Sequence, residues 1–186
     1  PDYRLLHGEC CAFSAILALQ QKRDEQAVSL AQEAIATIPQ AARAYAFALG
    51  SLYVIYQENG EFDKCLATCY QARDVARALK YPSMCATSVY SAALVLRIQG
   101  QLQRSAELLR EALEFAERHG QAHIFYYGLL HIGLAETHYE WYALDDMEAA
   151  LDTGVTLCLQ GGMSILAMIG IADQGEVKHA RGDTPA

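Results

Sequence analysis

Apolar residues recur along the chain at spacings of three and four, in blocks of about 15 to 20 residues. This is the period of an amphipathic α-helix, and the β-branched runs typical of strands are missing. The pattern predicts helices over residues 3–20, 25–38, 41–59, 61–79, 83–99, 101–119, 121–141, 144–159 and 164–180. Glycine or proline stands at most of the breaks, where helices commonly end. The sequence therefore predicts an all-α protein.

The breaks between these helices recur at a nearly constant interval. Matching turns at Gly60, Gly100, Tyr142 and Gly182 lie 40, 42 and 40 residues apart, and the turn at Lys22 lies a further 38 residues upstream. After each turn, three mostly small residues follow at spacings of four and three, which places them on one helix face: Ala27, Ala31 and Ala34; Cys65, Cys69 and Ala72; Ser105, Leu109 and Ala112; Met147, Leu151 and Gly154. Small side chains let paired helices approach closely.

This pattern resembles the tetratricopeptide repeat (TPR). It predicts a right-handed superhelical solenoid of antiparallel helix pairs, TPR-like but with a period of about 40 residues. We expect one repeat domain over residues 1–186, with repeats at 3–38, 41–79, 83–119 and 121–160 and an incomplete repeat at 164–183. Because the chain begins with Pro1 and ends after a first helix, we expect it to be a fragment of a longer polypeptide.

Three segments carry a closer resemblance. Residues 105–118 (Ser-Ala-Glu-Leu-Leu-Arg-Glu-Ala-Leu, then Ala-Glu-Arg), residues 132–145 and the closing residues 180–183 are similar to the repeats of the ATP-dependent LuxR-family regulators typified by MalT. The resemblance implies a longer protein in which a nucleotide-binding domain precedes the repeats and a helix-turn-helix domain follows them. The repeats receive a small-molecule inducer and partner proteins. No Gly-x4-Gly-Lys-Ser/Thr phosphate loop occurs here, so we expect no cofactor in this segment and ATP only on a missing domain.

Composition narrows the function classes. Fourteen basic residues stand against 22 acidic ones, a net charge of −8, so we expect no direct nucleic-acid binding. The longest apolar stretches are too short to span a bilayer, so no membrane insertion is expected. The six cysteines form no C-x-x-C units, and we interpret them as reduced, small apolar residues. Because reduced thiols are typical of the cytoplasm, we expect a cytoplasmic protein. No catalytic motif is present, and we predict a non-catalytic protein.

Candidate binding residues follow from the repeat register, because the first helix of each pair lines the concave side of such a solenoid. The polar or aromatic residues at inward positions are Gln57, Glu58, Tyr90, Arg97, Glu136, Tyr139, Glu140, Glu176 and His179. Arg97 is the one cation among them. This mixture suits a polyhydroxylated or amino-bearing small molecule, or a short peptide. The alternative is a set of solvated residues that pair with one another.

Metal binding is not predicted. His119 and His123 have the spacing of helical metal ligands, but Gly120 separates them, and Cys65 and Cys69 lie on the small-residue face. The sequence thus favours an effector-sensing and protein-interaction module of a MalT-like LuxR-family regulator. The alternative is a TPR-type scaffold or peptide-binding adaptor, with self-association through exposed repeat ends. The apolar residues expected at such an end are Ile165, Leu166, Ile169 and Ile171.

Overall fold

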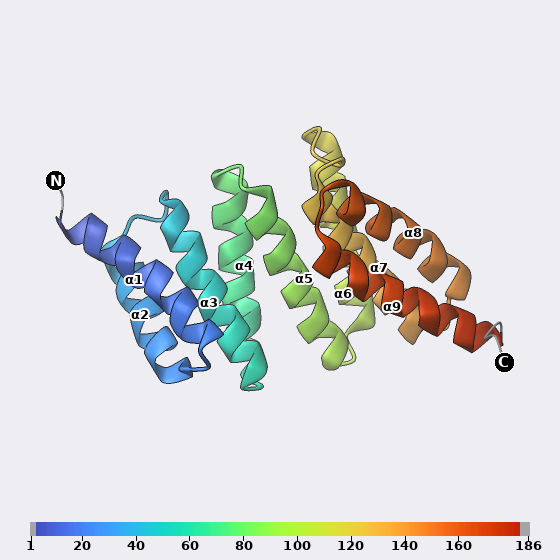
Figure 1. Cartoon of the computed structure of the whole chain (residues 1–186), viewed down its shortest axis with the longest axis horizontal. Coiled ribbons are helices and arrows are strands. Elements are labelled where there is room, and N and C mark those ends of the chain that lie inside the picture. The colour runs from blue at the N-terminus through green and yellow to red at the C-terminus, as the bar shows by residue number, and fades with distance from the viewer. Residues whose placement is uncertain (1–2, 183–186) are drawn as a thin grey trace. The chain divides into compact units, whose positions relative to one another are not determined.

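The computed structural model describes residues 3–182, and this part of the chain is helical without a strand. Figure 1 shows the succession of helices. Their bounds are α1 (Tyr3–Gln20), α2 (Asp24–Thr37), α3 (Arg43–Glu58), α4 (Phe62–Ala78), α5 (Pro82–Ile98), α6 (Leu102–Arg118), α7 (Gly128–Glu140), α8 (Leu144–Gln160) and α9 (Ser164–Arg181), with a 3₁₀ turn η1 (Phe125–Tyr127) before α7. Short turns join most consecutive helices, whereas a longer segment with η1 joins α6 to α7. Helix α1 packs on α2, α3 on α4 and α7 on α8. The predicted all-α fold of antiparallel helix pairs is confirmed.

Eight of the predicted helices match the observed ones within two residues at each end, and one prediction was wrong. Residues 121–127 were expected to be α-helical, but α7 begins only at Gly128. The backbone of Ile124 is extended, with φ −74° and ψ 122°. The Phe125 ring packs on Gly161, where an added Cβ would come within 2.5 Å of its atoms. This segment therefore covers the end of α8 instead of extending α7.

The turns share one backbone feature. A residue with positive φ ends nearly every helix: Lys22, Gly60, Lys80, Gly100, Gly120, Tyr142, Gly162 and Gly182. Such a left-handed residue closes the last helical turn, because its N–H reaches a carbonyl that has no partner inside the helix. Lys22 and Tyr142 occupy the positions that the repeat alignment had matched with glycine. The predicted equivalence of these turns is therefore confirmed.

The small-residue face is buried as expected. In α2 and α4 it is built from alanine and cysteine with at most 1% exposure. Gly154 takes the corresponding place in α8, and there the approach is closer: a Cβ on Gly154 would lie 2.8 Å from the Gly128 carbonyl oxygen. The same glycine would also meet Ile132 and His131. Helices α7 and α8 thus touch backbone to backbone, which only glycine allows.

The chain divides into two compact units, with the boundary between Val95 and Leu96 near the end of α5. In the first unit the rings of Phe13 and Phe47 lie 5.6 Å apart, and Phe47 meets Tyr81 edge-on at 6.0 Å. In the second unit α9 packs on α8, and its Ala167 belongs to a buried cluster with Ile132 and Cys158. None of the helices within residues 3–182 is long and apolar enough to cross a bilayer.

Candidate functional site

Five of the nine predicted binding residues come together in one pocket of the second unit. The pocket has a volume of about 190 Å³ and is formed by the last turns of α5 and α7, the start of α8 and the middle of α9. Its lining residues are Arg97, Glu136, Tyr139, Glu140, Met147, Asp173 and Glu176. Arg97, Glu136, Tyr139, Glu140 and Glu176 were in the predicted set. Their role in binding stays a prediction.

Helical spacing brings these side chains to the pocket. Glu136 and Glu140 stand one turn apart on α7, and Asp173 and Glu176 stand three residues apart on α9, so each pair shares a helix face. Arg97 lies in the last turn of α5, where the helix dipole favours a cation. Three separate helices therefore supply the charged groups of the pocket.

Two of the lining residues form an ion pair. Arg97 Nη1 lies 2.6 Å from Glu136 Oε2, and the two side chains are only 14% and 17% exposed. Removing two charges from water costs several kcal/mol per ion, and a single contact recovers this only in good geometry. A pair buried to this degree is weak evidence for a purely stabilising role. It does fix the position of both charges.

Asp173 is the charged residue of the pocket that the sequence did not predict, and Met147 is the other lining residue outside the predicted set. Its Oδ2 atom is buried and has no hydrogen-bond partner within the described part of the chain. Burial raises the pKa of the Asp173 carboxyl, as do the charges of Glu136 and Glu176, and although Arg97 opposes them this pKa reaches about 6. Asp173 lies on the same α9 face as Glu176, three residues before it. That spacing was the signal that could have found it.

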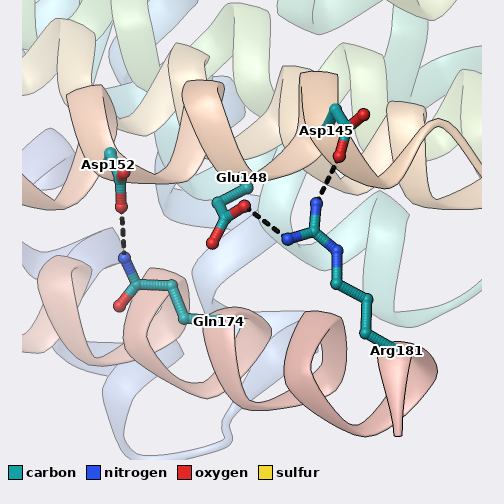
Figure 2. A network of polar contacts seen from close by, with 5 residues as sticks. All are labelled: Asp145, Glu148, Asp152, Gln174 and Arg181. Atoms are coloured by element: carbon teal, nitrogen blue, oxygen red, sulfur yellow. Dashed lines mark hydrogen bonds and ion pairs between the residues drawn. The ribbon is translucent and has the colours of Figure 1, made fainter. Parts of the chain in front are cut away.

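A polar network holds α9 in place beside α8. Arg181 donates to Glu148 at 2.7 Å and to Asp145 at 2.5 Å, and Gln174 donates to Asp152 at 3.0 Å (Figure 2). Gln174 is the neighbour of Asp173 in the sequence. These contacts link α8 to the C-terminal half of α9, which carries the two carboxylates of the pocket.

The charges of the pocket do not balance. Arg97 contributes one positive charge, and Glu136, Glu140, Asp173 and Glu176 contribute four negative ones when ionised, which leaves −3. The one cation is already bound to Glu136. Such a site favours a group that brings positive charge and N–H donors, because charge-assisted hydrogen bonds to carboxylates are strong.

The other four predicted residues do not line this pocket. Gln57 and Glu58 end α3 and Tyr90 lies in α5, all in the first unit. Glu58 is exposed and forms an ion pair with Lys22 at 2.9 Å. His179 is exposed near the end of α9. The ion pair of Glu58 agrees with the alternative of solvated residues that pair with one another. For Gln57, Tyr90 and His179 the predicted binding role stays a prediction.

The helix hairpins, their repeated left-handed turns and the buried small-residue face define a helical repeat protein of the TPR type. Within this class the chain belongs to the family of MalT-like TPR regions, whose family model matches residues 8–184. The predicted resemblance is thereby confirmed. TPR-like repeats generally mediate protein interactions and typically serve as non-catalytic scaffolds.

Solved structures share the fold at low sequence identity. Aspartyl phosphate phosphatase F from Bacillus subtilis is 13% identical with a TM-score of 0.75, and the match covers 94% of this chain and 45% of that one. The chain thus spans less than half of that phosphatase. The nearly identical TPR-like repeats of a Podosopora anserina protein named as a kinesin light chain are 16% identical with a TM-score of 0.64, covering 95% and 89%. BtubC from P. vanneervenii is 14% identical with a TM-score of 0.61, covering 92% and 80%. A search of curated protein sequences finds no significant match.

Proposed function

We propose that the chain is the effector-sensing and protein-interaction segment of a MalT-like, LuxR-family transcriptional regulator. In this proposal the pocket of the second unit receives a cationic group of the effector, either a small-molecule inducer or a side chain of a partner protein. Family membership supports the regulator assignment, and the unbalanced charge of the pocket supports the choice of ligand.

The observation that carries the proposal is the unpartnered Oδ2 atom of Asp173. A half-buried carboxylate whose one buried oxygen lacks a hydrogen bond, beside two other carboxylates, destabilises the folded chain. An ammonium or guanidinium group would donate to this oxygen and offset the repulsion from Glu136 and Glu176. Ligand binding would then give the Asp173 Oδ2 atom a hydrogen bond and reduce the repulsion between the carboxylates.

The size of the pocket limits the ligand. A volume of about 190 Å³ is smaller than the roughly 300–1,000 Å³ of pockets that enclose a whole drug-sized ligand. This space accommodates the amino-bearing end of a small metabolite, or the end of a lysine or arginine side chain. Tyr139 adds an aromatic ring to the lining, and such a ring attracts cations. An amino-bearing compound therefore fits better than a neutral polyol.

A panel of small molecules tests the binding proposal. Primary amines, amino sugars, guanidines, neutral sugars and carboxylates are added in turn, and the melting temperature is measured. We expect a rise with one or more cationic compounds, abolished by Asp173→Asn and unchanged by Glu58→Gln, which alters an exposed carboxylate of the first unit. Equal shifts in both variants, or shifts only with anionic compounds, would contradict the proposal.

The regulator role is tested separately from ligand binding. The test is to sequence the open reading frame upstream and downstream of the segment that encodes this chain. We expect a nucleotide-binding domain with a phosphate loop before the repeats and a helix-turn-helix domain after them. A reading frame that holds neither domain would leave the pocket unaffected but would refute the regulator assignment.

A second candidate function, self-association through an open repeat end, has one specific observation in its favour. Ile165, Met168 and Ile171 are exposed on α9, at 78%, 67% and 48%. Leu166 and Ile169, which were also expected to be exposed, instead pack partly buried against the core of the second unit. Light scattering of the chain and of Ile165→Glu tests this role: the wild type should form oligomers, and the variant should be monomeric.

A further inference from the structure

A second group of chemically reactive side chains lies in the first helix pair, far along the sequence from the pocket. His7 and Cys11 stand one turn apart on α1, and Glu33 faces them from α2. Glu33 Oε1 lies 2.7 Å from His7 Nε2, and Cys11 Sγ lies 3.6 Å from the same nitrogen. All three donor atoms fall within 4.8 Å of one another.

A close helix approach brings them together. Gly8 follows His7 and is buried, and an added Cβ there would come within 2.6 Å of Ile38 and 3.0 Å of Thr37. Glu33 lies one turn before Thr37 on α2, so contact at Gly8 brings its carboxylate to the face that carries His7 and Cys11. The thiol of Cys11 is buried with its residue at 5% exposure, whereas His7 and Glu33 are 59% and 50% exposed. The spot is open to solvent on one side.

The geometry does not fit a catalytic triad. In a Cys-His-acid triad the nucleophile and the acid contact opposite ring nitrogens of the histidine, because the acid must orient the ring while the other nitrogen takes the proton. Here the thiol and the carboxylate both approach Nε2. The single Nε2 atom cannot form a good hydrogen bond with the thiol and with the carboxylate at the same time. Three donors that point to one spot form the arrangement of a cation site.

One of the donor distances already fits a tetrahedral metal, and a second needs a small adjustment. With Zn–S near 2.3 Å and Zn–N near 2.0–2.1 Å, tetrahedral angles place sulfur and nitrogen about 3.5 Å apart. Cys11 Sγ and His7 Nε2 are 3.6 Å apart without any change. The carboxylate would have to withdraw from 2.7 Å to about 3.3 Å from the nitrogen, a small rotation for a half-exposed glutamate.

We propose that His7, Cys11 and Glu33 form a binding site for a borderline divalent metal ion of the zinc type. Imidazole, thiolate and carboxylate are the ligands that zinc takes in proteins, and the fourth position faces solvent and holds water. The thiol releases its proton to solvent as the metal–sulfur bond forms, so the ligand set with Zn²⁺ is neutral. The metal would join α1 to α2. This site is independent of the pocket in the second unit.

Cobalt substitution is the direct test. Metal-free chain in its reduced form is titrated with Co²⁺ while its absorption spectrum is recorded. We expect saturation at one Co²⁺ per chain, a thiolate-to-cobalt charge-transfer band in the near ultraviolet and the intense visible bands of tetrahedral cobalt. Added Zn²⁺ should remove these bands, because it binds the same ligands more tightly.

Variants locate the metal. Cys11→Ser should abolish the charge-transfer band. His7→Ala and Glu33→Gln, at exposed positions whose loss leaves the fold intact by circular dichroism, should weaken binding by at least about tenfold. Cys10→Ser is the matched control, because Cys10 is the adjacent but exposed thiol, and it should bind like the wild type.

Three results would overturn the proposal. The first is the absence of a charge-transfer band at saturating Co²⁺. The second is a band that persists in Cys11→Ser and disappears in Cys69→Ala, which would place the metal at the buried Cys65–Cys69 pair, whose sulfurs lie 3.9 Å apart. The third is unchanged affinity in both His7→Ala and Glu33→Gln, which would reduce the site to one thiol.

Discussion

Two ion pairs, one in each unit, show how polar residues at repeat ends come to line a pocket or stay in solvent. In the first unit Glu58 pairs with Lys22 at 2.9 Å, and these side chains are 41% and 70% exposed. In the second unit Arg97 pairs with Glu136 at 2.6 Å, and both are largely buried. The residue types are alike. The difference is that α9 places Asp173 beside the Arg97–Glu136 ion pair, and the three residues line one pocket.

This difference has energetic consequences. An exposed pair contributes about 0 to 1 kcal/mol, because water screens the charges and the long side chains lose freedom. A buried pair contributes little net stability, but loss of one partner leaves a charge without compensation and costs about 3 to 5 kcal/mol. The sensitivity of the two units to the same type of substitution should therefore differ strongly.

The largest effect is expected for the cation of the pocket. Arg97→Met leaves the largely buried Glu136 without its positive partner, and the free energy of unfolding should fall by about 3 kcal/mol. Lys22→Met, the matched change in the first unit, should alter it by less than about 0.5 kcal/mol. Denaturant unfolding at neutral pH measures both. Equal losses of unfolding free energy in the two variants would show that the buried and the exposed ion pair do not differ in the way proposed.

The next effect concerns how closely the helix pairs approach. Gly154→Ala places a Cβ 2.8 Å from the Gly128 carbonyl oxygen, and we expect a loss of about 2 kcal/mol. At the equivalent position in the first unit, Ala72 is already accommodated. If α7 and α8 were spaced like α3 and α4, the same substitution would instead stabilise the chain by about 1 kcal/mol. Thermal unfolding distinguishes the two signs.

A pH-dependent effect is expected at Asp173, whose pKa in the folded chain is raised to about 6 from an ordinary value of 3.8. Below pH 3.8 the Asp173 carboxyl is protonated in both the folded and the unfolded chain, so it does not lower the free energy of unfolding. As the pH rises from 3.8 to 6 the unfolded chain loses this proton first, so the folded chain is penalised, and the penalty is complete above pH 6. Because the group is half-exposed, we expect Asp173→Asn to stabilise by only about 1 kcal/mol at pH 8.

The control for this prediction lies in the first unit. Asp74→Asn alters a carboxylate that is exposed and paired with Arg73. It should change stability by less than about 0.5 kcal/mol at either pH. At pH 4 the gain from Asp173→Asn should shrink toward zero. A gain that is the same at pH 4 and pH 8 would show that the carboxylate charge is not its cause.

The smallest effects are expected at the turns, where the two units should behave alike. Lys80 in the first unit and Tyr142 in the second adopt φ values of 52° and 57°. Glycine takes this conformation without strain, so Lys80→Gly and Tyr142→Gly should each stabilise by about 0.5 to 1 kcal/mol. Gly60→Ala should cost about 1 kcal/mol, since no neighbouring atom opposes its Cβ and only the backbone is strained. Differential scanning calorimetry resolves these changes.

Periodicity predicted the fold well because the repeat imposes the same local requirements many times. Left-handed turns, buried small residues and helical spacing each appear several times in the sequence, so even Tyr142 could be matched to a glycine position. The segment before Gly128 could not be predicted in this way. Its conformation depends on the contact of Phe125 with Gly161, which lies 36 residues away and on another element.

The candidate site was only partly predictable. Register counting located Arg97, Glu136 and Glu176 because each lies on a helix face that the repeat defines. It could not separate these residues from Glu58, whose sequence context is similar, because the packing of the helices decides which residues line a pocket. The cluster of Cys11 with Glu33 was missed for the same reason: its members lie on two helices, and only the close approach at Gly8 joins them.

The central claim is that the pocket of the second unit is a site for a cationic group. Carbon-13 NMR of the Asp173 carboxyl, followed against pH with and without an amine selected from the small-molecule panel, tests it most directly. The account predicts a titration near pH 6 in the free chain and a shift to lower pH when the amine is bound, because a nearby positive charge favours the carboxylate. A titration that is identical with and without the amine at saturating concentration would contradict it.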